Sequence, residues 1–258
     1  VLSQEEINAL LNNNDAADSS DEILTESEKD AIGEIANISM GTAATTLFSL
    51  VNRRVEISTP VVSFSNWDKI VDEYEKPCVF IKIGYTQGLN GSNILVLKEK
   101  DVKIITDLMM GGDGTNINGE IGELHLSAIS EAMNQMMGSS ATSLSSMLNR
   151  TIDISPPIAE VVDLKNTLNE GEIDSFLSEE FVKISFHMEI GDLVDSEIMQ
   201  LYPPAFVKEM CKGVSQNMEL DTQSVTEDVP QSSNTATQAA PIQQPQDSGS
   251  MNNASANS

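Results

Sequence analysis

Apolar side chains recur every three or four residues over residues 25–50, which predicts a long amphipathic helix. This stripe consists of Ile32, Ala36, Ser39, Ala43, Leu47 and Leu50. A second stripe with similar spacing predicts another helix over roughly residues 120–148. Its members are Ile129, Met133, Met136, Ser140, Leu144 and Met147. Because both stripes include small residues, we expect these helices to pack closely against each other or against a sheet.

Short runs of β-branched and other apolar residues predict strands at residues 54–64, 78–84 and 93–97, followed by a helix over 101–110. The same order returns as strands at 151–164, 181–190 and 197–202 and a short helix over 203–212. The glycine-rich stretch at 111–114 is interpreted as a helix end and turn, since no Gly-Lys-Ser/Thr follows it. The predicted fold class is α+β, with two long helices packed on an antiparallel β-sheet.

One pattern of polar residues occurs twice, 97 positions apart. The first copy is Asp30, Glu34, Asn37 and, after 22 further residues, Pro60. The second copy, with the same spacing, is Ser127, Glu131, Asn134 and Pro157. Only two copies occur and no shorter period is present, so the pattern indicates a duplicated half-domain rather than a solenoid. We expect two repeats, 25–119 and 120–213, related by a pseudo-two-fold axis and carrying two equivalent candidate sites.

On a helix, the Glu and Asn of each copy share a stripe that is offset from the apolar face. They should therefore face solvent or enter a partner's cleft. Gly41 and Gly138 continue this stripe. A glycine in mid-helix costs about 1 kcal/mol relative to alanine and permits another molecule to approach closely. A single Glu-x-x-Asn is typical of a solvated helix face, but two copies in register favour a functional site, although duplication itself explains part of the similarity.

Other chemistries find less support. The only histidines are His125 and His187, and no His-Glu-x-x-His pattern occurs, so a zinc site is not expected. No phosphate loop, dinucleotide-binding fingerprint or nucleophile elbow is present. Carboxylates from the two copies could form a glycosidase-like pair only if the fold brought them together.

The composition of the chain indicates which classes of partner and which cellular location to expect. The formal net charge is −26, which argues against nucleic acids and anionic membranes and suits basic protein surfaces, although solubility alone explains it equally well. Cys78 and Cys211 are interpreted as reduced, buried thiols. No stretch is long and apolar enough to span a membrane, and no signal peptide opens the chain. We therefore expect a cytoplasmic protein without membrane insertion.

Residues 1–11 predict a short amphipathic helix with a capping box and a hydrophobic staple. Its defining side chains are Leu2, Ser3, Glu6, Ile7, Leu10 and Leu11. Residues 12–24 are interpreted as a flexible linker, which favours a tethered peptide ligand over a terminal helix packed on its own domain. Residues 214–258 lack aromatic and basic residues and are interpreted as a disordered tail or linker.

The doubled motif resembles the signature of the CheC/CheX/FliY phosphatases of bacterial chemotaxis. The opening ten residues from Leu2 also resemble the peptide with which flagellar switch proteins bind phosphorylated CheY. Leu108-Met109-Met110-Gly111-Gly112 is similar to a helix end of the same family. The resemblance covers roughly residues 1–212, and the N-terminal peptide favours the FliY members over CheC.

This resemblance implies a CheC-like fold and hydrolysis of the aspartyl phosphate of phosphorylated CheY. Asn37 and Asn134 would each orient a water in the CheY active site, while Glu34 and Glu131 would engage CheY, through its active-site lysine. The assignment of partner contacts extends to Asp30, to Ser127 and to the N-terminal peptide. No cofactor of the chain's own is implied, and Mg²⁺ is expected on the partner CheY.

The resemblance also implies a place in the flagellar motor switch at the basal body, with FliM, FliG and FliN-like proteins as partners. FliY members continue into a FliN-like domain that the printed sequence does not include, so we expect the chain to be a fragment in that respect. Two alternatives stay open: a non-catalytic switch scaffold of the FliM type that docks phosphorylated CheY, and a phosphatase for another response regulator. Retention of both Glu/Asn pairs favours catalysis over a scaffold.

Overall fold

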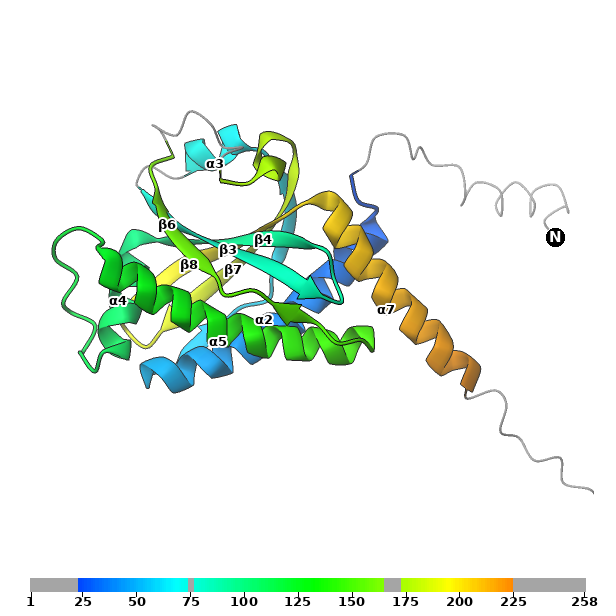
Figure 1. Ribbon diagram of the computed structural model, residues 1–258, viewed down its shortest axis with the longest axis horizontal. Coiled ribbons are helices and arrows are strands. Elements are labelled where there is room, and N and C mark those ends of the chain that lie inside the picture. The colour runs from blue at the N-terminus through cyan, green and yellow to red at the C-terminus, as the bar shows by residue number, and fades with distance from the viewer. Residues whose placement is uncertain (1–22, 74–76, 165–172, 225–258) are drawn as a thin grey trace, which may run out of the picture.

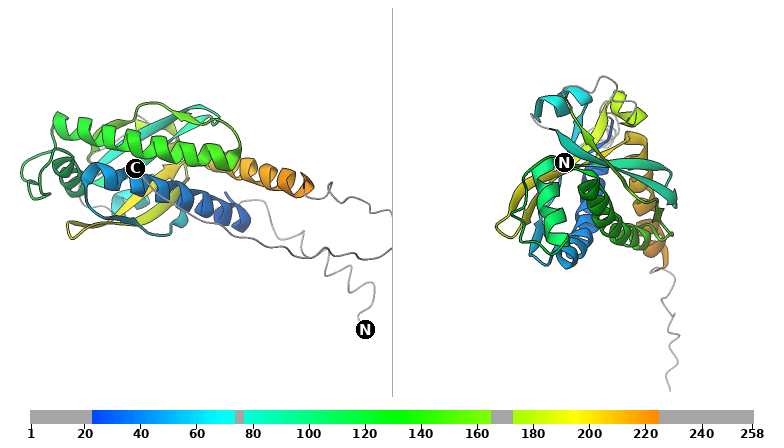
Figure 2. Two further views of the ribbon diagram at one scale, coloured as in Figure 1. Left: turned by 90° about the horizontal axis from the view of Figure 1, so that it is seen from below. Right: turned by 60° about the vertical axis from the view of Figure 1, so that its left-hand side comes forward.

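Two long helices run side by side at the centre of one layer of the molecule (Figures 1 and 2). The computed structural model describes residues 23–73, 77–164 and 173–224. Helices α2 (Glu26–Val51) and α5 (Glu123–Leu148) bury most of the stripes predicted from the sequence. Both predicted helices are therefore confirmed.

The two long helices end in the same way. Asn52 and Asn149, which are 97 positions apart, adopt left-handed backbone conformations with φ of 50° and 47°. Asparagine tolerates this region better than most residues with a Cβ, which explains why both copies of the repeat have asparagine at this position. At its start, α2 is capped by Thr25, whose Oγ1 accepts a hydrogen bond from the Glu28 N–H at 3.2 Å.

Hydroxyl pairs join α2 to α5. Thr42 Oγ1 lies 2.8 Å from Ser143 Oγ, and Thr46 Oγ1 lies 2.7 Å from Ser139 Oγ. Residue numbers rise along one helix while they fall along the other, so the helices cross antiparallel. Thr42 and Ser139 are counterparts in the repeat, as are Thr46 and Ser143, so the two hydrogen-bonded pairs are equivalent under the pseudo-two-fold symmetry. The helices therefore cross midway between the two pairs.

One antiparallel sheet of eight strands carries the helices. Its members are β1 (Val55–Ile57), β2 (Val61–Ser65), β3 (Cys78–Gln87), β4 (Gly91–Lys98), β5 (Asp153–Ile154), β6 (Ile158–Val162), β7 (Phe181–Ile190) and β8 (Val194–Tyr202). The strand order is β1-β7-β8-β4-β3-β5, with β2 also paired to β7 and β6 also paired to β3.

The two halves of the chain exchange their first strands. Strands β1 and β2 pair with β7 of the second half, while β5 and β6 pair with β3 of the first half. The register repeats as well, because Val61 opposes Ser185 and its counterpart Ile158 opposes Lys82. The sequence repeat is thus also a repeat of strand pairing.

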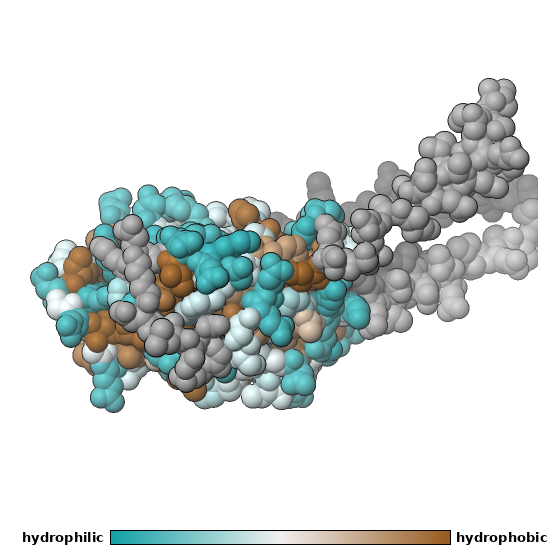
Figure 3. Space-filling model, turned by 90° about the horizontal axis from the view of Figure 1, so that it is seen from above, coloured by the Kyte–Doolittle hydropathy of each residue, from teal (hydrophilic) through white to brown (hydrophobic). Residues whose placement is uncertain are grey.

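Helices cover the two faces of the sheet unequally. Helices α2 and α5, together with α4 (Glu99–Met109) and α7 (Pro204–Ser224), enclose the larger hydrophobic core. On the opposite face, the described residues form α3 (Trp67–Glu73) and the 3-10 helix η1 (Ser175–Ser178), which cover a smaller cluster with Phe80 and Phe181. In the described part of this face, hydrophobic residues are interspersed with hydrophilic ones (Figure 3).

Several sequence-based expectations were wrong in detail. The runs 54–64 and 151–164 are each two short strands rather than one, because a proline without a backbone N–H interrupts each run at Pro60 or Pro157. Helix α3 was not predicted, although Asn66 caps it by accepting a hydrogen bond from the Lys69 N–H at 3.0 Å.

The predicted ends of the domain also need correction. Leu24 was assigned to the linker but is fully buried, as expected for a leucine that meets an apolar core. Helix α7 continues to Ser224 rather than ending near residue 212, so the predicted tail cannot begin at 214. A single glycine, Gly213, costs a helix only about 1 kcal/mol, and good helix formers follow it in the sequence.

The helix predicted at residues 1–11, most of the linker and residues 225–258 lie outside the described residues. Among the helices that the structure describes, none combines the length and apolar character needed to cross a bilayer.

Candidate functional site

The first copy of the motif lies on the exposed side of α2. Asp30, Glu34 and Asn37 are exposed, while Ile35 and Ala36 between them are buried. Gly41 follows one turn after Asn37, and a Cβ added there would meet no atom within 4 Å. The predicted offset between the motif and the apolar stripe is therefore confirmed, and the space beside Gly41 is open to another molecule.

A groove runs along the first motif. Its volume is about 480 Å³, and it lies between α2 and the segment from Thr59 to Val62. The α2 side is formed by Glu26, Lys29, Asp30, Gly33, Glu34 and Asn37. Pro60 belongs to the opposite wall, which gives a structural reason for the fixed spacing between Asn37 and this proline. The groove brings the polar motif side chains together at a surface that a second protein can reach.

The second copy lies on α5 in a similar setting with different neighbours. Ser127 and Glu131 are exposed, Asn134 is half-buried, and the space beside Gly138 is open. Here Glu131 Oε1 accepts a hydrogen bond from Gln135 Nε2 at 2.8 Å. In the first copy the corresponding position is Ile38, whose side chain is hydrophobic and 41% exposed. The prediction of two equivalent sites is therefore wrong at this position.

The two sites are well separated. Ala44 and Ala141 lie midway between the hydroxyl pairs that join α2 to α5. Asn37 and Asn134 each precede these alanines by seven residues on antiparallel helices. At 1.5 Å per residue, the two asparagines are about 20 Å apart along the helix axes.

This separation excludes one of the chemistries that the sequence left open. Glu34 and Glu131 each lie three residues further from the crossing point than the asparagines, about 30 Å apart along the axes. Glycoside hydrolysis needs its two carboxyl groups within about 10 Å of each other. These glutamates therefore cannot act as a pair on one glycosidic bond, and each Glu/Asn pair is a separate candidate site.

The described residues offer few groups of their own for covalent or metal chemistry. No set of three or more His, Cys, Asp or Glu in the described ranges could hold a metal ion. Cys78 and Cys211 are buried, and burial raises the pKa of each thiol from 9.0 to about 11, so both stay protonated and weakly nucleophilic near neutral pH. What the two sites present to a partner is an exposed carboxylate and an amide one helical turn apart.

Comparisons with known proteins agree with this geometry. The model of the CheC-like family matches residues 28–64 and 124–161, which contain both motifs and the strands that follow them. The crystal structure of Thermotoga maritima FliY superposes with a TM-score of 0.69 at 42% identity, covering 76% of this chain and 99% of that one. The chain belongs to the CheC-like family.

Curated members of the CheC-like family from Bacillus subtilis (strain 168) are also similar. The flagellar motor switch phosphatase FliY is 47% identical over 218 residues, which are 83% of this chain and 57% of that protein. The CheY-P phosphatase CheC is 24% identical over 143 residues, covering 54% of this chain and 67% of that one. The chain thus spans less than two thirds of the B. subtilis FliY that it matches.

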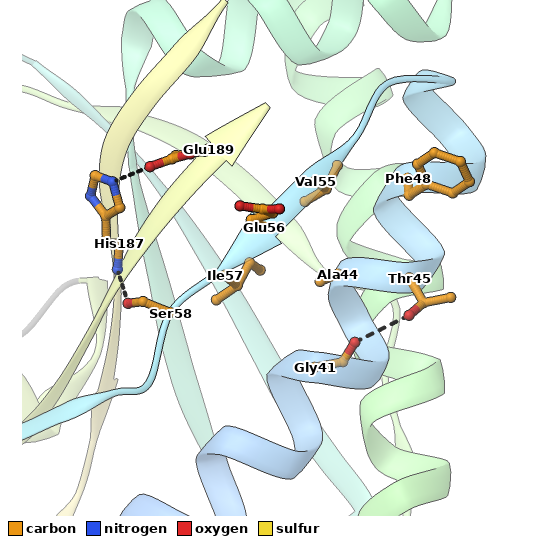
Figure 4. A pocket seen from close by; sticks show the side chains of 10 residues that line it. All are labelled: Gly41, Ala44, Thr45, Phe48, Val55, Glu56, Ile57, Ser58, His187 and Glu189. Atoms are coloured by element: carbon orange, nitrogen blue, oxygen red, sulfur yellow. Dashed lines mark hydrogen bonds and ion pairs between the residues drawn. The ribbon is translucent and has the colours of Figure 1, made fainter. Parts of the chain in front are cut away.

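A second groove within this CheC-like domain was not predicted from the sequence. It lies further along α2, where Phe48 is exposed and where His187 and Glu189 of β7 complete the wall (Figure 4). Phe48 could have been found as a position where the two repeats differ, because its counterpart is Ser145. The predicted partner contacts Leu2, Ser3, Glu6, Ile7, Leu10 and Leu11 lie outside the described residues.

Proposed function

We propose that the chain hydrolyses the aspartyl phosphate of phosphorylated CheY. The observation that carries this proposal is the pair of Glu/Asn motifs at the surface, each with an exposed glutamate and each followed by a glycine with open space beside it. The name of the similar B. subtilis FliY, a flagellar motor switch phosphatase, supports it. A purely structural module of the same fold has no chemical need for an exposed carboxylate with an amide one turn later at both positions.

In this mechanism the asparagine amide positions the attacking water. Asn37 or Asn134 enters the active site of CheY, where the amide N–H₂ and C=O can hold one water in line with the acyl phosphate. The water oxygen attacks phosphorus, the bond from phosphorus to the aspartate oxygen breaks, and the products are inorganic phosphate and a free carboxylate. A proton released from the water passes to phosphate or solvent. No covalent intermediate on this chain is needed.

The carboxylate has a docking role in this proposal. Glu34 and Glu131 pair with the active-site lysine of CheY, and Asp30 and Ser127 contact the partner one turn earlier. Phosphoryl transfer depends on positioning and charge neutralisation, and CheY supplies both the lysine and Mg²⁺. We assign no cofactor to the chain itself.

The proposed setting is the flagellar motor switch at the basal body, on the cytoplasmic side, with FliM, FliG and FliN-like proteins as partners. The N-terminal residues 1–11 would bind phosphorylated CheY as a helix on a tether. Tethering raises the effective concentration of the substrate near both sites without adding a catalytic group.

Decay of radiolabelled phospho-CheY tests the proposal. The wild-type chain should accelerate decay, while Asn37→Ala together with Asn134→Ala should reduce the acceleration by about 100-fold or more, because the attacking water loses its positioning. Asn118→Ala, at an exposed asparagine outside both motif helices, serves as the matched control and should behave like the wild type. Unchanged turnover in the double variant would exclude the mechanism. Binding without any acceleration by the wild type would favour the scaffold alternative.

A further inference from the structure

The groove missed by the sequence analysis, here named the α2–β7 groove, adjoins the first site. It has a volume of about 590 Å³ and is lined by α2 from Gly41 to Phe48, by β1 and by two residues of β7 (Figure 4). Gly41 lies one helical turn after Asn37 on the same stripe. A protein that reaches Asn37 therefore also comes close to the entrance of this groove.

Part of the groove wall is apolar, with side chains from both α2 and β1. Phe48 lies in the groove wall near the end of α2 and is 48% exposed, while Ala44 and the half-buried side chains of Val55 and Ile57 contribute further apolar surface. Exposed phenylalanine beside a concave surface is typical of an anchor for a partner, since aromatic side chains dominate binding energy at interfaces.

The β7 side of the groove is acidic. Glu56 and Glu189 are register partners on β1 and β7, and Glu189 is in turn the register partner of Asp195 on β8. Like charges that face each other across strands destabilise a sheet, so three carboxylates in one row have a cost that folding alone does not require.

Nearby basic side chains offset this row only in part. His187 Nε2 lies 3.0 Å from Glu189 Oε1 and 3.4 Å from Asp195 Oδ1, and Arg54 contacts Glu56. Three carboxylates against one guanidinium and one imidazole leave the row negative. The rim therefore favours a partner with basic residues.

The second half of the chain does not repeat this surface. Ser145 stands at the position of Phe48, and its Oγ accepts a hydrogen bond from the Ile152 N–H at 2.9 Å, which holds the start of the second half's first strand against α5. On β3, Gly84 takes the position of His187, and no carboxylate takes the position of Glu189, because Thr86 and Gln87 stand at the register shift opposite Asp153. Because the fold forms without these side chains in one half, their presence in the other half is not a requirement of the fold.

We propose that the α2–β7 groove binds a segment of the phosphorylated partner that presents basic residues and an apolar side chain. The partner is the same protein whose phosphoryl group reaches Asn37, so this inference rests on the proposed function. Charge complementarity with the acidic row and continuity with the first motif both point to this occupant. The first site then has a larger docking surface than the second.

The experiment isolates the first site in an Asn134→Ala background and measures the phospho-CheY concentration dependence of turnover. Phe48→Ser installs the residue that the second half has at that position, and Glu189→Thr replaces the carboxylate with an uncharged side chain present in the corresponding part of β3. Both side chains are exposed, so Phe48→Ser should keep the thermal stability of the parent, and Glu189→Thr should not lower it because it removes one carboxylate from the row. Phe48→Ser should raise KM about fivefold with kcat unchanged, as expected for loss of an interface anchor.

Glu189→Thr should raise KM at low ionic strength, and this difference should shrink at high salt because the lost contact is electrostatic. Val161→Ser, which removes a similarly exposed apolar side chain (44%) on β6, is the matched control and should leave KM unchanged. If both groove variants keep the parent KM, the groove is not a docking surface for this partner. Concentration-dependent self-association that Phe48→Ser abolishes, with KM unchanged, would instead assign the groove to a second copy of the chain.

Failure of this inference can be distinguished from failure of the proposed function. Adding Asn37→Ala to the same background removes the last catalytic asparagine and should abolish turnover whatever the groove does. Loss of turnover in that variant together with a wild-type KM in both groove variants would leave the proposed function standing and overturn the groove alone.

Discussion

Glu34 and Glu131 occupy the same position of the repeated motif, but their side chains are held differently. Glu131 accepts the hydrogen bond from Gln135, one turn further along α5, whereas Ile38 at the corresponding position of α2 has no polar group to offer. A pair of this kind on a helix surface is worth about 0.2–0.5 kcal/mol. It favours one arrangement of the Glu131 carboxylate before a partner arrives.

Exchanging these two neighbours tests whether Gln135 positions Glu131. Gln135→Ile, measured with Asn37→Ala so that only the second site works, should raise KM for phospho-CheY by up to about twofold, because Glu131 then loses its preferred arrangement. Ile38→Gln with Asn134→Ala should lower KM by a similar factor. In both cases kcat should stay unchanged, since neither residue touches the phosphoryl group. A change in kcat at constant KM would contradict a positioning role.

On the two motif helices, sequence reasoning emphasised positions at which the two copies agree. The exposed Glu/Asn pairs followed from their offset from the apolar stripe. Gln135 and Phe48 were missed because comparison of the copies emphasised identity, whereas these positions matter through their difference. The hydrogen bond of Gln135 and the open space beside Phe48 depend on tertiary packing, which a sequence pattern does not specify.

At the scale of elements, both motif helices carry a glycine where alanine would make a more stable helix. A Cβ at Gly41 or Gly138 would meet no atom within 4 Å, so neither glycine is required by packing inside the domain. Glycine in a helix interior costs up to about 1 kcal/mol relative to alanine. The open surface that it leaves is explained if a partner approaches the helix at that point.

Substitution of these glycines should separate stability from activity. Gly41→Ala together with Gly138→Ala should raise the free energy of unfolding by about 1–2 kcal/mol in urea titrations, while lowering kcat/KM for phospho-CheY, because the partner meets added atoms at both sites. Ser146→Ala, at an exposed position of α5, is the control for helix propensity and should leave activity unchanged. Higher stability with full activity in the glycine variant would show that the partner does not approach there.

At the scale of the whole molecule, the α+β class and the two helices could be predicted, but the exchange of first strands between the halves could not. The apolar pattern of β2 and β6 indicates which side of each strand faces the core. It does not indicate whether the strand pairs with β7 or with β3, because either pairing is compatible with that pattern. Pairing of β4 with β8 joins the halves into one sheet, and the exchange adds the first strands of each half to the strands of the other. Each half therefore depends on the other for its fold, so loss of stability in one half should affect the entire domain.

Two buried thiols on opposite faces of this sheet make stability sensitive to alkaline pH. Cys78 belongs to the smaller cluster under α3, and Cys211 on α7 belongs to the larger core. Burial raises the pKa of both thiols to about 11, while the ordinary value is 9.0. Because the folded state holds these protons more tightly, the stability they contribute is fully present below pH 9 and is lost as the pH rises through 11.

The expected loss between pH 9 and pH 11 is a few kcal/mol, which urea unfolding at pH 7, 9 and 10.5 can measure. Tyr85 and Tyr202 are also buried with raised pKa values, and the net charge becomes more negative with pH, so the wild type should lose stability from these causes too. Cys78→Ala with Cys211→Ala isolates the thiols. It should be less stable than the wild type at pH 7, because it leaves small cavities, but should lose less stability between pH 7 and 10.5. Equal losses in the two proteins would mean that the thiols titrate normally in the folded state.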